Sequence, residues 1–251
     1  MLILLPPSET KRDGGGAPRL DVTSLAFPRL APERRVVVKA LRELARDDDE
    51  SARALKLGPQ QSHELARNRS FTTSPTMPAI DRFTGVLFDG LEAHTLTEAE
   101  RSFAGEHVLI HSALLGPVSA LDSVPAYRLS HNSRLPGVSL RSHWAAPVAA
   151  QIAAHDGLVL DLRSEGYAAL GPRPKRDDSV FVRVVSEGDD GRRRALNHFN
   201  KKAKGEFTRA VLQQGAAFDT VDDAIDGARS VGWRLERSSD PGELELVVAA
   251  H

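Results

Sequence analysis

The pattern of hydrophobic and polar positions alternates between short apolar runs and amphipathic stretches. Residues 2–5, 107–111 and 158–162 are short apolar runs, which are typical of buried strands. Between the last two runs, apolar residues recur at helical spacing from Leu140 to Ile152 and predict a helix. A strand, a helix and a strand in this order form a βαβ unit, whose strands are normally parallel. The loops after 107–111 and 158–162 should therefore leave the same edge of a sheet.

A helical segment interrupts this pattern at about residues 32–70. Helical periodicity follows Pro32, and two shorter helices flank the break at Gly58-Pro59. Two short helices around such a break could form a helix-hairpin-helix, a module that offers backbone amides to DNA phosphates. The usual Gly-x-Gly hairpin is absent, so a plain helical connection is the alternative reading.

The C-terminal part continues the mixture of strands and helices. Two hairpins are predicted, one from segments 180–186 and 194–199 and one from 233–237 and 243–248. Helices are predicted from Ala203 through Leu212 and over 220–229. No repeat or linker divides the chain. The prediction is a single α/β (mixed α+β) domain over 1–251, with a mixed central sheet, surrounding helices and the helical insert.

Composition narrows the class of protein. The 251 residues carry a formal net charge of −1, so an anion-binding surface has to be a local patch. There are no cysteines, which excludes disulfides and thiolate metal sites, and the nine histidines are scattered, so no metal is predicted. No glycine-rich dinucleotide or Walker A motif is present, and no cofactor is expected. The apolar N-terminus is too short for a signal peptide or a membrane span, so we expect a cytoplasmic, soluble protein.

Polar side chains follow the predicted strands. Ser8, Ser112 and Ser164 each come just after an apolar run, but no Gly-x-Ser-x-Gly elbow surrounds them, which argues against a hydrolase triad. If they are functional, their hydroxyls should line a polar site at the sheet edge; otherwise they are turn serines. The catalytic candidates for an enzyme are Ser8, Ser112, Asp161, Ser164, Tyr167 and His198.

A lysine-rich junction at 197–205 is the main candidate for anion binding. It combines three lysines with the start of a helix, and both ammonium groups and helix N-termini favour anions. A solvated helix start is the alternative. The residues predicted to contact nucleic acid are Lys11, Arg128, Lys201, Lys202, Lys204 and Arg209.

Several short motifs, read in order along nearly the whole chain, resemble the YaaA family of peroxide stress resistance proteins. They are residues 1–4 with Pro7-Ser8 and Lys11, 83–91, 112–116, Leu121-Asp122, Pro125 with 127–129, Trp144, Asp161-Leu162 with Ser164 and Tyr167, and 201–205. Each motif is weak alone, whereas the ordered set is specific. One departure is that Ser119-Ala120 stand where the family usually has an arginine followed by a proline.

The resemblance implies a fold and a function. It implies a single cytoplasmic α/β domain with a positively charged cleft, associated with limiting free intracellular iron and DNA damage under hydrogen peroxide. It also implies DNA binding, with a helix-hairpin-helix-like element on residues 51–68 and the cleft on Lys201, Lys202, Lys204 and Arg128. The loss of an arginine at Ser119 removes one anion contact.

Three hypotheses follow. The first is a non-enzymatic, monomeric stress protein that contacts the DNA backbone and reads shape rather than sequence, with no membrane partner. The alternative is an enzyme acting on a nucleotide, a nucleobase or another small anionic substrate in the same cleft. Direct iron binding is the third, and scattered histidines without cysteines make it the weakest.

Overall fold

The first apolar run forms the central strand. β1 (Leu2–Leu5) is buried along its whole length and pairs in parallel with β3 (Val108–Ser112) on one side and β6 (Val159–Asp161) on the other. A parallel strand covered on both faces needs apolar residues at every position, which explains the unbroken apolar run. The predicted parallel arrangement of β3 and β6 is confirmed, with β1 inserted between them.

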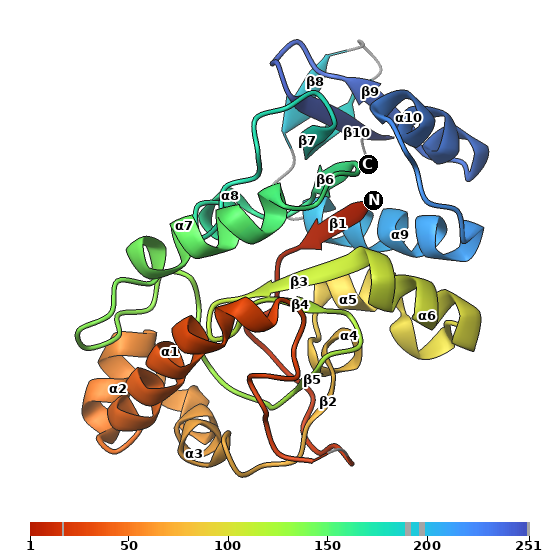
Figure 1. Cartoon of the computed structure of the whole chain (residues 1–251). Helices are drawn as coiled ribbons and strands as arrows, with labels where there is room; N and C mark the ends of the chain where they lie inside the picture. Colours follow the sequence, from red (N-terminus) through yellow and green to blue (C-terminus); the bar gives the residue numbers. More distant parts are fainter. Residues whose placement is uncertain (17, 189–191, 196–198, 250–251) are drawn as a thin grey trace.

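The computed structural model describes residues 1–16, 18–188, 192–195 and 199–249. Within these ranges the main sheet has eight strands in the order β4-β3-β1-β6-β7-β10-β9, with β8 paired to β7 (Figure 1). β7 and β10 continue the parallel series, whereas β4, β8 and β9 pair antiparallel, so the sheet is mixed as predicted. The additional strands are β4 (Gly116–Ser119), β7 (Ser179–Glu187), β8 (Arg193–Ala195), β9 (Arg234–Arg237) and β10 (Glu243–Ala249).

Helices cover both faces of this sheet. Figure 1 shows α7 (Leu140–Ala153) and α8 (Glu165–Ala168) on one side of β1, and α9 (Phe199–Gln214) on the other. α5, α6 and α10 lie on the same side as α9. Their bounds are Val86–Leu91, Glu98–His107 and Val221–Ser230. The helices predicted over 140–152, 203–212 and 220–229 are confirmed, as is the hairpin of 233–237 with 243–248. The pairing of 180–186 with the segment from Arg194 is confirmed as far as Ala195, while 196–198 lie outside the described residues and Phe199, predicted in that strand, begins α9.

The predicted helical insert is present at one end of the molecule. It consists of the 3-10 turn η1 (Pro28–Leu30) with α1 (Ala31–Leu44), then α2 (Asp48–Leu55), the turn η2 (Pro59–Gln61) and α3 (His63–Ser70). A connecting region follows, with β2 (Met77–Pro78) paired to β5 (Ser123–Val124), α4 (Ala79–Arg82) and η3 (Ala93–Thr95).

Two buried arginines tie this half of the chain together. Arg34 of α1 is fully buried, and its guanidinium donates to five backbone carbonyls, including Leu115 at 2.8 Å and Pro117 at 3.1 Å. Arg82 is also fully buried and donates to the carbonyls of Val124, Arg12, Gly14 and Pro75. A guanidinium presents five donors, so each arginine satisfies several loop carbonyls that would otherwise be buried without partners.

Helices α5 and α9 cross at very short range. A Cβ atom on Gly205 would lie 1.9 Å from the carbonyl oxygen of Leu87, and one on Gly90 would lie 2.8 Å from that of Lys202. Only glycine allows backbones to approach this closely. The motifs 83–91 and 201–205 therefore pack against each other.

None of the helices that the structure describes is long and apolar enough to span a membrane.

Candidate functional site at the carboxyl edge of the sheet

The carboxyl ends of β1, β3 and β6 meet at one edge because the three strands are parallel neighbours. Ser8 follows β1, Ser112 ends β3, and Asp161 and Ser164 stand at and after the end of β6. The predicted convergence of these loops at one edge is confirmed, and this edge is where α/β proteins usually hold ligands.

The serines of this edge have different roles. Ser112 is fully buried, its Oγ accepts from the backbone N–H groups of Leu114 and Leu115 at 3.1 and 2.9 Å, and it lies 2.6 Å from the Tyr127 hydroxyl. Ser8 Oγ donates to the carbonyl of Thr10 at 2.5 Å. Ser164 is exposed at the start of α8. The first two hydroxyls therefore shape turns.

Lys11 is buried in the loop after β1. Its Nζ donates to the carbonyls of Ser8 and Glu9, each at 3.1 Å, and lies 4.2 Å from the centre of the Tyr127 ring. Burial lowers the pKa of Lys11 to about 7, with Glu64 opposing this and Arg128 adding to it. At neutral pH this amine is thus close to the midpoint of its titration, a property of groups that transfer protons.

Arg128 lies beside Lys11 and is held from two directions. Its Nη2 donates to Glu9 Oε2 at 2.5 Å, while Asn68 of α3 bonds to both its backbone N–H and its carbonyl, at 2.7 and 2.8 Å. Ser130 donates to the other Glu9 oxygen at 3.3 Å. The helical insert therefore positions Arg128 at the sheet edge. Burial also raises the pKa of nearby Tyr167 to about 12, which keeps its hydroxyl protonated.

A buried ion pair with a histidine beside it lies under this edge. Arg163 donates to both carboxylate oxygens of Asp161, from Nε at 2.8 Å and Nη2 at 2.7 Å, and its Nη1 lies 2.7 Å from His111 Nδ1. Burial, and then the Arg163 charge, hold the pKa of His111 well below its usual range, so the imidazole is neutral and accepts through Nδ1. Its Nε2 is buried without a hydrogen-bond partner in the described part of the chain.

Lys204 of α9 is the second buried amine. Its side chain approaches the sheet, where Nζ donates to the Arg163 carbonyl at 3.4 Å and lies 5.6 Å from the centre of the Phe181 ring. Burial lowers its pKa to about 8, opposed by the Asp161 charge. Phe181 lines an open cavity of about 390 Å3. Its other lining residues include Asp161, Glu165, Arg173, Lys175, Arg183 and Glu243.

The remaining predicted residues lie elsewhere. Lys201 and Lys202 are exposed on the first turn of α9, with Lys202 Nζ 3.4 Å from Glu206. Arg209 donates to the carbonyls of Leu91 and Glu92 and to Thr95 Oγ1, and so caps the end of α5. His198 lies outside the described residues. The six predicted cations are thus distributed between buried positions and solvent. The structure places Lys11 and Arg128 close together, whereas Lys201 faces solvent.

Comparison with known proteins agrees with the resemblance. A family model described as "Peroxide stress protein YaaA" matches residues 1–238. The chain belongs to this family. A UPF0246 protein of Corynebacterium glutamicum (strain R) is 39% identical over 254 residues, covering 99% of this chain and all of the relative. A UPF0246 protein of Streptomyces coelicolor is 37% identical, with 99% and 98% covered. Family membership is consistent with a role in peroxide stress.

The structure shows the role of two of the motifs that carry the resemblance. The motif at Asp161 carries the carboxylate that binds Arg163, and the motif at Ser112 forms the turn beneath Tyr127. Ser119, at the end of β4, uses its Oγ to donate to the Gly105 carbonyl at 2.7 Å.

Sequence reasoning missed Glu9, His111, Arg163 and Phe181. Glu9 and Arg163 lie inside motifs already singled out, and their opposite charges beside Lys11 and Asp161 were the available signal. His111 and Phe181 stand within predicted strands, where the sequence gives no sign of the neighbours that make them part of the site.

Proposed function

We propose that the chain serves peroxide defence by binding and acting on a small anionic substrate, of nucleotide or nucleobase type, at the carboxyl edge of the sheet. The observation that carries this proposal is Lys204. Its ammonium is almost fully buried, yet its one hydrogen bond to a described residue is 3.4 Å long. An ammonium has three donors, and a buried charge without adequate partners is costly. Lys204 does not itself line the cavity, but Phe181 does, and an anionic group that reached past this ring to Nζ would supply the missing acceptors.

The surroundings of Lys204 suit such a substrate. The Phe181 ring offers a flat face for a base, and a cavity of about 390 Å3 lies within the usual range of ~300–1,000 Å3 for small-molecule sites. Lys204 would hold the anion and, with a pKa of about 8, could exchange a proton with it near neutral pH. Asp161 would keep the ammonium charged, since its carboxylate raises that pKa.

The test separates the buried lysine from its exposed neighbour. Binding of AMP and of orthophosphate would be measured by calorimetry for the wild type, Lys204→Met and Lys201→Ala. Methionine keeps the apolar stem and removes the charge, so AMP binding should weaken at least ~10-fold, the usual effect of losing a charged hydrogen-bond partner. Lys201→Ala should bind AMP within about twofold of the wild type, because Lys201 faces solvent. Unchanged AMP binding by Lys204→Met, or no binding by the wild type, would refute the proposal.

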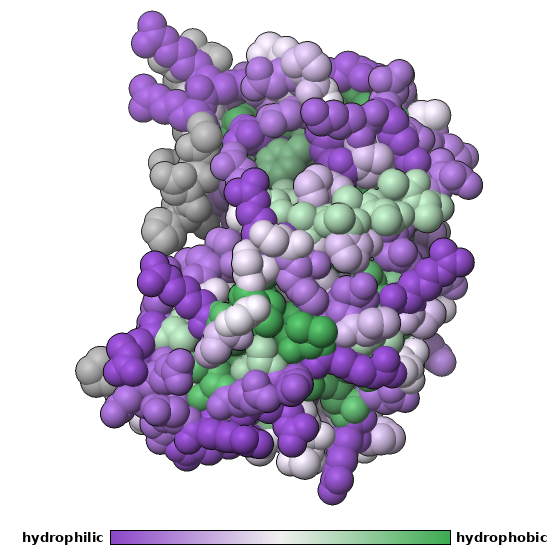
Figure 2. Space-filling view, turned by 60° about the vertical axis from the view of Figure 1, so that its left-hand side comes forward, coloured by the Kyte–Doolittle hydropathy of each residue, from purple (hydrophilic) through white to green (hydrophobic). Residues whose placement is uncertain are grey.

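DNA binding is the second candidate function, and the geometry of the insert favours it. α2 and α3 contact each other and are joined by residues 56–62, where Lys56 is exposed and takes a left-handed backbone conformation with φ of 56°. Arg53 is also exposed on α2. Figure 2 shows mostly hydrophilic residues on the side of the molecule turned forward there, around a hydrophobic patch near its centre. A helix pair joined by an exposed basic turn is a suitable contact for a phosphate backbone.

Duplex, bubble and junction DNA carrying a fluorescent label would test this second function by anisotropy at low and physiological salt. Affinity should fall steeply with salt, and Arg53→Ala/Lys56→Ala should reduce the slope of log K against log salt by ~0.9 for each lost phosphate contact. Lys201→Ala should also weaken DNA binding, whereas Lys204→Met should not, because Lys204 is buried. Affinity independent of salt would exclude this mode.

The cellular effects that we propose are a smaller pool of free iron and less DNA damage during hydrogen peroxide exposure. A deletion strain complemented with Lys204→Met or with Arg53→Ala/Lys56→Ala would show which of the two surfaces these effects require. Chelatable iron measured by electron paramagnetic resonance is the readout.

A further inference from the structure

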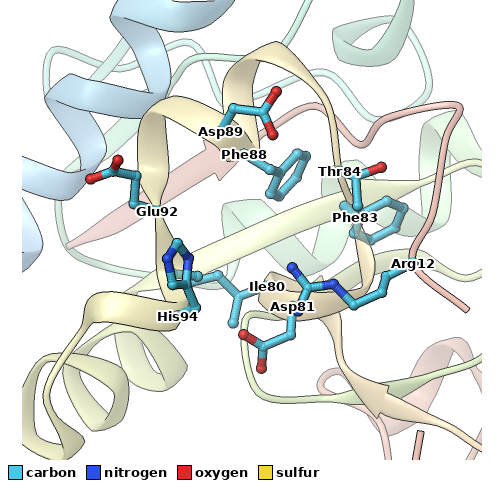
Figure 3. Close-up of a pocket in the computed structure, with 10 residues that line it drawn as sticks. Arg12, Ile80, Asp81, Phe83, Thr84, Phe88, Asp89, Glu92 and His94 are labelled. Atoms are coloured by element: carbon cyan, nitrogen blue, oxygen red, sulfur yellow. The ribbon is translucent and has the colours of Figure 1, made fainter. Parts of the chain in front are cut away.

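Charged side chains in two parts of the molecule differ in what satisfies them. A cavity of about 270 Å3 lies beside α4, α5 and η3, with Arg12 and Asp89 on different sides of it (Figure 3). Both side chains are exposed, so water satisfies them. Asp161, Arg163 and Lys204 are instead buried and depend on protein atoms. Their hydrogen bonds therefore show which of these three groups is free for a ligand.

Arg163 occupies the carboxylate that Lys204 would otherwise bind. Burial lowers the pKa of Lys204, the Asp161 charge opposes this, and the Arg183 charge adds to it, so Asp161 is near enough to attract the ammonium. Yet Asp161 accepts from Nε, Nη2 and the backbone N–H of Arg163, at 2.8, 2.7 and 3.1 Å. A carboxylate engaged through both oxygens forms a neutral pair with the guanidinium. Among the described residues, Lys204 Nζ has only the 3.4 Å bond to the Arg163 carbonyl.

His111 holds Arg163 in this arrangement. Its Nδ1 lies 2.7 Å from Arg163 Nη1 and must accept, because a guanidinium has only donors. The proton of the neutral ring is therefore on Nε2, which has no partner in the described part of the chain. The bond to Arg163 is thus the polar contact that accounts for a histidine here. Both side chains are fully buried, so Nη1 would be left without an acceptor if the imidazole were removed.

We propose that His111 is a positioning residue of the substrate site, which acts through Arg163 to keep Asp161 from pairing with Lys204. His111, Arg163 and Asp161 form a lock in which the carboxylate is already neutralised, so the Lys204 ammonium stays available to an anionic substrate. Without the bond to His111 the guanidinium is free to turn away, and Asp161 then competes with the substrate. This role rests on the function proposed for Lys204, whereas the lock is measured without a substrate.

The titration of Lys204 tests the lock. It is followed in lysine-labelled protein without AMP through the 13Cε signal that is lost in Lys204→Met. Burial lowers the wild-type pKa to about 8. His111→Leu removes the acceptor, and the pKa of Lys204 should then rise by ~1 pH unit or more, because a released carboxylate favours the charged amine. His111→Asn places an amide oxygen near the position of Nδ1 and should restore most of the wild-type value.

A matched control and AMP binding complete the experiment. Leu109→Ala changes a buried residue on the same face of β3 that takes no part in the lock, and it should leave the Lys204 titration unchanged. AMP affinity measured by calorimetry should fall ~10-fold in His111→Leu, since one pH unit of added pairing corresponds to tenfold competition. It should recover in His111→Asn.

The outcomes separate the lock from the substrate. An unchanged Lys204 titration in His111→Leu, or an equal change in Leu109→Ala, would overturn the proposal. If His111→Leu does not fold, 15N spectra of the wild-type ring decide. A bare Nδ1 coupled to the Arg163 side chain supports the lock, and a protonated Nδ1 overturns it. If the wild type does not bind AMP while the titration shifts as expected, the proposed substrate is refuted and the lock is retained.

Discussion

Individual residues show most clearly what local sequence can and cannot predict. The sequence picked out six cations as phosphate contacts, yet Lys11, Arg128 and Lys204 are buried whereas Lys201 and Lys202 are exposed. Lysine and arginine are rarely buried, so a sequence pattern places them in solvent by default. Whether one becomes buried depends on partners distant in the chain, such as Glu9 for Arg128, which is 119 positions away. Contacts with such distant partners produce no periodic pattern in the sequence.

The buried Lys11 should make stability depend on pH. Its pKa is about 7 in the folded protein and 10.5 in the ordinary case, so between these values the unfolded chain binds more protons. The free energy of unfolding should therefore rise with pH across this window, by at most ~1.4 kcal/mol per pH unit from this group. In Lys11→Met this contribution is absent. Urea unfolding of both proteins from pH 7 to about 9.5 measures the difference in slope.

Other groups define the limits of this experiment. Lys204, with its pKa lowered to about 8, contributes a rise in the wild type and in Lys11→Met alike. The raised pKa of Tyr167 opposes the rise only near and above the ordinary tyrosine value of 10, so the range stops below it. Lys39→Met, at an exposed lysine, is the control and should keep the wild-type slope. Equal slopes for Lys11→Met and the wild type would show that Lys11 keeps an ordinary pKa when folded.

Whole elements were more predictable than single residues because their signals are local. Apolar runs located β1, β3 and β6, and the helical period located α1, α7, α9 and α10. The stretch 84–91 had no assignment, since α5 has six residues, too few for a period, and starts after Gly85, whose φ is 89°. The need for glycine at position 90 becomes apparent only from its close approach to the backbone of α9. Alanine at Gly205 or Gly90 would bring a methyl group against a backbone carbonyl and force the helices apart.

At the scale of the molecule, the sequence predicted a mixed sheet and which loops share an edge. It did not predict that β1 lies between β3 and β6, nor that β7, β10 and β9 extend the same sheet. The two pairings of β1 join segments more than a hundred residues apart, Ile3 with Val108 and Leu2 with Val159. Strand order depends on which strand edges remain free to pair. The local hydrophobic periodicity of the sequence gives no information about it. The candidate site lies where it does because this order brings the carboxyl ends of β1, β3 and β6 together.

A continuous sheet from β4 to β9 predicts that the chain unfolds as one unit. Its two tryptophans are suitable probes because they stand near opposite ends of the strand order. Trp144 is buried on α7 and donates to the Ala113 carbonyl at 3.0 Å, close to β3 and β4. Trp233 directly precedes β9 and packs edge-on against Phe207, with ring centres 5.8 Å apart.

Trp144→Phe and Trp233→Phe each leave a single tryptophan to report on one end of the sheet. In each variant, urea unfolding followed by fluorescence should coincide with unfolding followed by far-ultraviolet circular dichroism, because a single cooperative domain loses both signals together. Comparing the two signals within one variant removes the effect of the substitution on stability. If one end unfolded at lower urea than the bulk helix signal, the chain would consist of two units. The proposed substrate site, which joins residues after β6 to Lys204 of α9, would then depend on how those units dock.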